Sequence, residues 1–163
     1  MFKTTNFMDD IGRGKVGERI FIDDFLKFLN IKYKDVTNCQ KFQIIDSDYL
    51  STIGSYEVKM NYKDNEILII EEYTNINQDL GRVSQGWFYK SGADMLVFIS
   101  KATHTMILIP FTDKFKEKYN SIKINYKLNR NYPSKHNGNM WQSAYRRIPL
   151  DVLSGYYSYY KRG

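Results

Sequence analysis

The chain has little of what exported, disulfide-linked or membrane-spanning proteins need. Cys39 is the only cysteine among 163 residues, which excludes an internal disulfide and a thiolate metal cluster. No apolar run approaches the roughly 20 residues of a membrane-spanning helix. The strongest runs, Met95–Ile99 and Met106–Ile109, are only long enough for strands. The first residues carry charges where a signal peptide has its apolar stretch. We therefore expect a cytoplasmic protein in a reducing compartment, with no membrane segment.

Several other features are scarce or absent. The chain has 3 prolines and shows no internal repeat, low-complexity tract or Pro/Gly/Ser-rich linker, which favours a single domain over residues 1–163. No Gly-rich loop followed by Lys-Ser/Thr is present, and no Ser nucleophile elbow, so the sequence supports neither nucleotide hydrolysis nor serine-hydrolase chemistry. His104 and His136 lack the companions that a zinc site needs.

Positive charge is abundant and unevenly distributed. The net charge is +6, and the segment from Asp113 to Arg147 holds nine Lys or Arg against two acids, so the rest is close to neutral. The same segment holds five Tyr or Trp residues. Cations mixed with aromatic rings suit a phosphate backbone with adjacent bases, although a solvated basic surface has the same composition. The candidate cations of this segment are Lys114, Lys118, Lys123, Lys127, Arg130, Arg146 and Arg147.

Apolar periodicity gives a coarse order of elements. Helices are predicted at Gly14–Leu29, at a short turn over Gln85–Ser91, at Phe111–Tyr119 and from Pro149 to Tyr160. Strands are predicted at Ile31–Val36, Phe42–Leu50, Ser55–Asn61, Glu66–Tyr73, Asp94–Ser100, His104–Pro110 and Ile122–Lys127. Ser55–Asn61 and Glu66–Tyr73 are expected to form a hairpin around Lys63-Asp64-Asn65. Thr74–Val83 and Asn129–Met140 are expected to be irregular. Together these elements predict an α/β or mixed α+β fold, with a sheet flanked by helices.

One strand carries a pattern that suits metal-dependent chemistry. Glu57 and Lys59 are two residues apart, so they share a strand face. Asp48 lies on the preceding segment, and the turn between them would bring the two carboxylates together. Converging carboxylates repel each other unless a cation lies between them, and hard oxygen ligands suit Mg²⁺ or Mn²⁺. An exposed strand face with two solvated charges is the simpler explanation of this pattern taken alone.

Longer motifs add a family resemblance. Phe42-Gln43-Ile44-Ile45-Asp46-Ser47-Asp48 followed by Tyr56-Glu57-Val58-Lys59 resembles the core of the PD-(D/E)XK nucleases, in particular small phage and bacterial members. Glu71 with Asn75 and the segment Gly86-Trp87-Phe88-Tyr89-Lys90-Ser91-Gly92-Ala93-Asp94 match later motifs of those members, as does Ile148-Pro149-Leu150. The resemblance covers roughly residues 14–153. The polar stretch 74–85 is longer than the family pattern.

The resemblance implies a restriction-endonuclease-like fold and a set of site residues. Asp48 and Glu57 would be metal ligands together with the Val58 carbonyl, and Lys59 would be the catalytic lysine. Further expected site residues are Glu18, which matches an extra acid near the metal, Glu71, which would support the site, and Lys90, which would contact phosphate. Asp46 is a rival to Asp48, because residues two apart would share a strand face, and Glu72 is a rival to Glu71, because the two acids are adjacent.

The sequence therefore predicts a Mg²⁺- or Mn²⁺-dependent endonuclease that hydrolyses the backbone of DNA, with RNA a less favoured substrate. A homodimer is expected where both strands are cut symmetrically. The alternative is an inactive module that binds nucleic acid or a partner protein through the basic segment, because a family fold does not establish activity.

Overall fold

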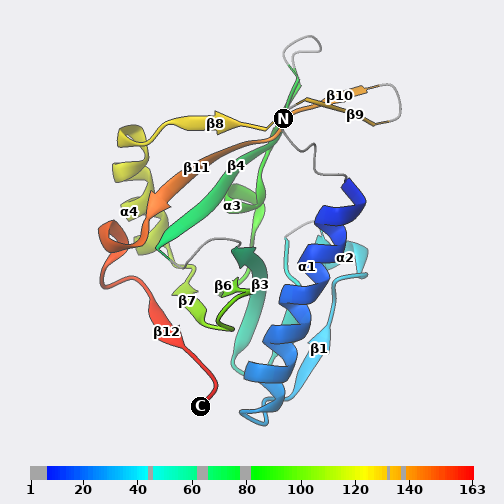
Figure 1. Ribbon diagram of the computed structural model, residues 1–163, viewed down its shortest axis with the longest axis vertical. Helices are drawn as coiled ribbons and strands as arrows, with labels where there is room; N and C mark the ends of the chain where they lie inside the picture. Colours follow the sequence, from blue (N-terminus) through cyan, green and yellow to red (C-terminus); the bar gives the residue numbers. More distant parts are fainter. Residues whose placement is uncertain (1–6, 44–45, 62–65, 78–81, 132, 137–138) are drawn as a thin grey trace.

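The computed structural model describes residues 7–43, 46–61, 66–77, 82–131, 133–136 and 139–163, and these residues form three β-sheets with helices packed around them (Figure 1). The predicted mixed fold is confirmed: the largest sheet contains both parallel and antiparallel pairs, and helices flank it. Within the described part of the chain, no helix is long and apolar enough to cross a membrane.

The largest sheet, here called sheet A, has six strands. Their order is β1 (Tyr33–Asp35), β2 (Tyr49–Ser51), β3 (Gly54–Asn61), β6 (Met95–Ser100), β7 (Met106–Pro110) and β12 (Ser158–Tyr160). The pair β3–β6 is parallel and the others are antiparallel. Strand β6 is buried on both faces, which explains its unbroken apolar sequence.

Helix α1 (Phe7–Phe21) covers one face of sheet A and continues as a π-helical turn, η1 (Ile22–Lys27). Phe21 and Leu26 pack there against Tyr56 and Val58 of β3. Gly17 allows this approach, because an added Cβ would lie 3.2–3.3 Å from Met60 side-chain atoms. The predicted helix over Gly14–Leu29 is confirmed from Gly14 to Lys27, and the helix begins earlier than predicted, at Phe7.

The other face of sheet A packs against a second sheet, here called sheet B. Its order is β5 (Arg82–Gln85), β4 (Ile67–Asn77), β11 (Ala144–Pro149) and β8 (Leu128–Arg130). Helices α3 (Trp87–Lys90) and α4 (Asp113–Ile122) complete this core, in which Leu68 and Ile70 of β4 meet Phe115 and Tyr119 of α4. A two-stranded sheet pairs β9 (Ser134–His136) with β10 (Asn139–Trp141).

The predicted hairpin between Ser55–Asn61 and Glu66–Tyr73 is wrong. Both segments are strands, but β3 pairs with β2 and β6 in sheet A, whereas β4 pairs with β5 and β11 in sheet B. The alternating apolar residues of β4 are buried against α4 and β11, and this burial decides which sheet the strand joins. The Lys63-Asp64-Asn65 turn lies outside the described residues.

Other boundaries also differ from expectation. The predicted strand Phe42–Leu50 is a short helix, α2 (Gln40–Gln43), and then only β2; Ile44 and Ile45 lie outside the described residues. The end of α4 and a 3₁₀ turn, η3 (Lys123–Asn125), replace the predicted strand Ile122–Lys127. The predicted C-terminal helix is a 3₁₀ turn, η4 (Leu150–Leu153), followed by β12. The segments expected to be irregular contain parts of β4 and β5, and β8, β9 and β10. The short turn α3 and helix α4 agree with prediction.

Candidate active site

The β2–β3 hairpin places Asp48 beside the part of β3 that extends past its pairing with β2. Tyr49 is paired with Tyr56, and the Asp48 amide donates to the Tyr56 carbonyl at 2.8 Å. Asp48 directly precedes β2, and its Oδ2 accepts a hydrogen bond from the Val58 amide, also at 2.8 Å. The amide and carbonyl of one strand residue point to the same side, so the Val58 carbonyl is directed toward this edge as well. Asp48 and the Val58 carbonyl thus belong to one edge of β3.

Glu57 and Lys59 lie on the other face of β3 from the residues that pack on α1, as the strand alternation predicted. The Glu57 side chain is buried, at 2% exposure, and its Oε1 forms an ion pair with Lys59 Nζ. Its Oε2 is buried with no hydrogen-bond partner. Burial raises the pKa of Glu57 to about 8, the Lys59 ammonium acts against that rise, and the Asp48 carboxylate adds to it.

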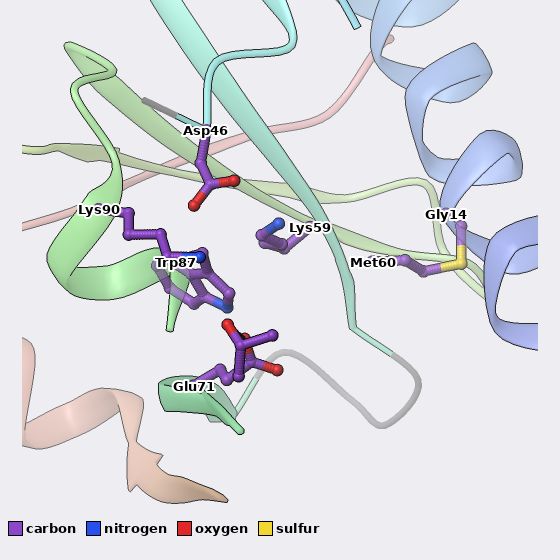
Figure 2. A pocket seen from close by; sticks show the side chains of 8 residues that line it. Gly14, Asp46, Lys59, Met60, Glu71, Trp87 and Lys90 are labelled. Atoms are coloured by element: carbon purple, nitrogen blue, oxygen red, sulfur yellow. Dashed lines mark hydrogen bonds between the residues drawn. The ribbon is translucent and has the colours of Figure 1, made fainter. Parts of the chain in front are cut away.

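A cleft of about 580 Å³ opens beside Lys59. Figure 2 shows Asp46, Lys59, Trp87, Lys90 and Glu71 around the cleft, with Asp46 and Glu71 on opposite sides of Lys59 and Trp87. The Lys59 ammonium lies 5.5 Å from the centre of the Trp87 ring. Asp48 and Glu57 are not among the residues that line the cleft, whereas Lys59, Glu71 and Lys90 of the predicted set do line it.

The structure distinguishes the two adjacent acids of β4. Glu71 lines the cleft, where it accepts a hydrogen bond from Thr74 Oγ1 at 3.3 Å, and burial raises its pKa. Glu72 lies on the opposite face of the strand, where it accepts hydrogen bonds from Tyr119 at 2.7 Å and from Arg146 at 3.0 Å. Glu71 is therefore the acid on the side of the site, and Glu72 belongs to the core.

Asp46 and Glu18, two further acids of the predicted site, both lie near the β2–β3 hairpin. Asp46 has a positive φ of 43° in the turn before β2 and lines the cleft, so it does not share a strand face with Asp48 as predicted. Glu18 of α1 accepts a hydrogen bond from the Tyr49 hydroxyl at 3.4 Å. Burial and the nearby Asp48 carboxylate both raise the pKa of Glu18, which places this acid within electrostatic reach of Asp48.

The close approach of α3 to β4 depends on Gly86. The Gly86 amide donates to the Glu72 carbonyl at 2.7 Å, and an added Cβ would lie 2.5 Å from the Glu71 carbonyl oxygen. This contact holds Trp87 against the strand that carries Glu71. Thr74, which the sequence assigned to a polar loop, lines the cleft because β4 continues to Asn77. No single residue signals that continuation, because pairing with β5 maintains it.

The predicted phosphate contacts do not form one continuous row. Lys90 is exposed at the cleft and Arg147 is exposed on β11, whereas Lys114 and Lys118 are on α4. Lys123 donates to the Tyr89 hydroxyl at 2.7 Å. Lys127 and Arg130 are exposed beside or on β8.

Arg146 differs from the other cations because its guanidinium binds Glu72 and the Tyr126 carbonyl on the inner side of sheet B. The expectation that Arg146 contacts phosphate does not fit this placement, since its charge neutralises a buried acid.

The donor atoms near Lys59 limit which metal site the protein can form. Among the described residues, no group of three or more His, Cys, Asp or Glu side chains is placed to hold a metal ion. Asp48, Glu57 and the Val58 carbonyl supply a smaller set of hard oxygen donors, and Mg²⁺ is commonly bound by one or two carboxylates with water and phosphate completing its shell. The buried Glu57 Oε2 that lacks a partner is the observation that fits a cation.

Comparisons with known proteins add little to this geometry. No protein-family model matches the chain, and no curated protein matches it. One solved structure with a related arrangement is the bacterial homing endonuclease I-Ssp6803I, at 11% identity and a TM-score of 0.46, over 62% of this chain and 68% of that one.

Proposed function

We propose that this protein is a metal-dependent nuclease that hydrolyses the phosphodiester backbone of DNA. The supporting observation is the buried Glu57 carboxyl, which is paired with Lys59 on one oxygen and unpartnered on the other, close to Asp48. A buried acid with an unsatisfied oxygen is costly for the fold, so a functional reason for retaining it is expected. Two further acids, Glu71 and Asp46, line the adjoining cleft.

In this proposal Asp48, Glu57 and the Val58 carbonyl would hold a Mg²⁺ or Mn²⁺ ion. Such an ion lowers the pKa of bound water and stabilises negative charge on phosphate. Lys59 faces the cleft with three donor hydrogens, so it can hold a phosphate oxygen or orient the attacking water. Trp87 forms an apolar wall next to that ammonium, which excludes water and strengthens the interaction of Lys59 with an anion.

The distribution of charge favours a nuclease over a module that only binds nucleic acid. A phosphate that enters the cleft would meet Glu71 and Asp46 as well as Lys59 and Lys90. Acids in such a position repel a phosphodiester, which is useless for binding unless a cation offsets them. A module that only binds nucleic acid would gain nothing from Glu71 and Asp46 in this position, and the described residues indicate no other role for the two acids.

The test is cleavage of labelled linear duplex, single-stranded and four-way-junction DNA, and of RNA, with Mg²⁺, with Mn²⁺ and with EDTA. We expect metal-dependent cleavage by the wild-type protein and a loss of at least about 100-fold for Lys59→Ala, because one positioned charged group contributes on this order. Lys101→Ala is the matched control, since Lys101 is exposed in the turn between β6 and β7.

A second readout does not depend on activity. Mn²⁺ should raise the thermal midpoint of the wild-type protein and of Lys101→Ala, and should leave the midpoint of a folded Asp48→Asn variant unchanged. Binding of nucleic acid with no cleavage of any substrate, together with no stabilisation by metal, would exclude the nuclease and support the inactive binding module.

A further inference from the structure

The described residues leave one face of sheet B open beside the cleft. Leu68 and Ile70 of β4 point into the core, and the residues that alternate with them point the other way: Ile67 and Ile69 are 39% and 40% exposed. Glu71 continues this series and is the residue that lines the cleft. The open face therefore begins at the candidate active site and extends away from it along β4.

The neighbouring strand β11 adds aromatic and cationic groups to the same face. Residues paired across two antiparallel strands point to the same side, and Tyr145 is paired with Glu71 while Arg147 is paired with Ile69. Tyr145 is half-buried and Arg147 is exposed, with the guanidinium 6.0 Å from the centre of the Tyr145 ring. Helix α4 packs on the opposite side of the sheet, so it does not cover this face (Figure 1).

This combination of groups suits unpaired bases better than it suits a duplex. An aromatic ring, a guanidinium plane and flat aliphatic side chains on a sheet provide surfaces on which bases stack. A duplex presents two phosphate backbones and requires rows of cations. On β4 and β11, Arg147 is the exposed cation of this face, because Arg146 points inward to Glu72.

A second copy of the chain is a weaker candidate for covering this face. The net charge of +6 opposes self-association, and it attracts a polyanion. Continuity with the cleft also favours a nucleic-acid substrate. Tyr145 is paired directly with Glu71, so a DNA strand that lies across Tyr145 reaches the cleft at Glu71.

We propose that the face formed by Ile69, Tyr145 and Arg147 binds the unpaired bases of single-stranded DNA and leads that strand into the cleft at Glu71. This inference rests on the proposed nuclease function, because it assigns single-stranded DNA as the class of substrate that enters the cleft. It concerns binding, which is measured without metal and without cleavage.

The test is fluorescence anisotropy in EDTA with a labelled single-stranded DNA, the same sequence as a duplex, and the corresponding RNA. We expect the wild-type protein to bind the single strand more tightly than the duplex. Tyr145→Ala should weaken single-strand binding at least about fivefold, the lower limit for losing one base stack, and Tyr145→Phe should bind like the wild-type protein because the ring remains.

A matched pair of isoleucine variants controls for general loss of apolar surface. Ile69→Ala should weaken single-strand binding, and Ile124→Ala should not, since Ile124 is 84% exposed in the turn after α4. Thermal midpoints identify any variant that has lost its fold. If Tyr145→Ala is unstable, Arg147→Gln serves as the second variant, because Arg147 is exposed.

Three outcomes would overturn the inference. These are duplex binding as tight as single-strand binding, tighter binding of RNA than of DNA, and a dimer in sedimentation that Tyr145→Ala dissociates. Each outcome is separable from the nuclease proposal. Cleavage of duplex DNA, with no effect of Tyr145→Ala on single-strand binding, would contradict this inference and leave the nuclease proposal intact. Binding of single strands through Tyr145 without any cleavage removes the nuclease and leaves the binding face.

Discussion

At the residue scale, Glu57 is an acid in surroundings that differ strongly from water. It is buried, its Oε2 has no hydrogen-bond partner, and its pKa is raised to about 8 from 4.5. Without a metal ion, the buried Glu57 carboxyl therefore holds its proton to a higher pH in the native protein than in the unfolded chain. A cation bound at Glu57 would displace that proton, so metal affinity and protonation of this carboxyl are expected to compete.

The first prediction follows from this protonation. A raised native pKa gives a contribution to stability that is fully present below pH 4.5 and is lost as the pH rises to about 8. In EDTA, the wild-type protein should lose stability relative to Glu57→Gln across this window, by up to about 1.4 kcal/mol per pH unit. Urea denaturation of both proteins from pH 5 to pH 8 measures the difference in their free energies of unfolding. The raised pKa values of Asp48, Glu18 and Glu71 affect both proteins, so their contributions largely cancel in this difference. A difference that does not vary with pH would contradict the prediction.

Individual site residues also show which features of the site could be predicted from the sequence. The placement of Asp48 near Glu57 and the shared face of Glu57 and Lys59 follow from strand alternation and a short turn, and both are local properties. The choice between Glu71 and Glu72 is not local. It depends on Arg146 and Tyr119, which are 74 and 47 residues away from Glu72 and neutralise or hydrogen-bond it. A pattern of neighbouring residues cannot contain that information.

At the scale of elements, the junction between β4 and α3 determines the shape of the site. Gly86 has φ −77° and ψ 175°, which any residue can adopt, so its requirement for glycine is steric rather than conformational. An added Cβ would be 2.5 Å from the Glu71 carbonyl oxygen and 2.8 Å from two backbone carbons. Backbone atoms cannot swing aside as a flexible side chain can, so either α3 or β4 must shift.

The second prediction is that Gly86→Ala lowers the free energy of unfolding by about 2–3 kcal/mol, within the range for overpacked sites, and also weakens catalysis by moving Glu71 and Trp87. Gly14→Ala is the matched control for the free energy of unfolding alone, because Gly14 itself lines the cleft. Gly14 lies inside α1 with no atom within 4 Å of an added Cβ, and alanine favours a helix by about 0.5–1 kcal/mol. Chemical denaturation should show opposite signs for the two variants. Equal stability of Gly86→Ala and the wild-type protein would show that the junction is not close-packed.

The order of elements could be predicted from periodicity, and the strand pairing could not. Strands β3, β6 and β7 were found because each is a short apolar or alternating run. The sequence between β3 and β4 suggested a hairpin, but hydrophobic burial against α4 and pairing with β11 place β4 in another sheet. Residues that are distant in sequence therefore decide the two-sheet arrangement around the cleft.

At the scale of the whole molecule, the position of charge matters more than its total. The whole excess of positive charge lies between Asp113 and Arg147, yet these cations face different directions. Lys114 and Lys118 belong to α4, which packs on the inner face of sheet B, whereas Arg147 lies on the open face next to Tyr145. A net charge of +6 attracts DNA from a distance, and the local arrangement then decides which cations touch phosphate.

The third prediction tests this distribution through salt dependence. Each phosphate contact to a single strand contributes a slope of about −0.7 to the dependence of log binding constant on log salt concentration. Arg147→Gln should therefore reduce the slope for single-stranded DNA by about 0.7. The double variant Lys114→Gln/Lys118→Gln removes twice as much charge and should change the slope less, because both lysines lie on the helix behind the sheet. Anisotropy titrations over a series of salt concentrations in EDTA provide the slopes. A larger effect of the α4 pair than of Arg147 would place the bound strand on the helix side of sheet B.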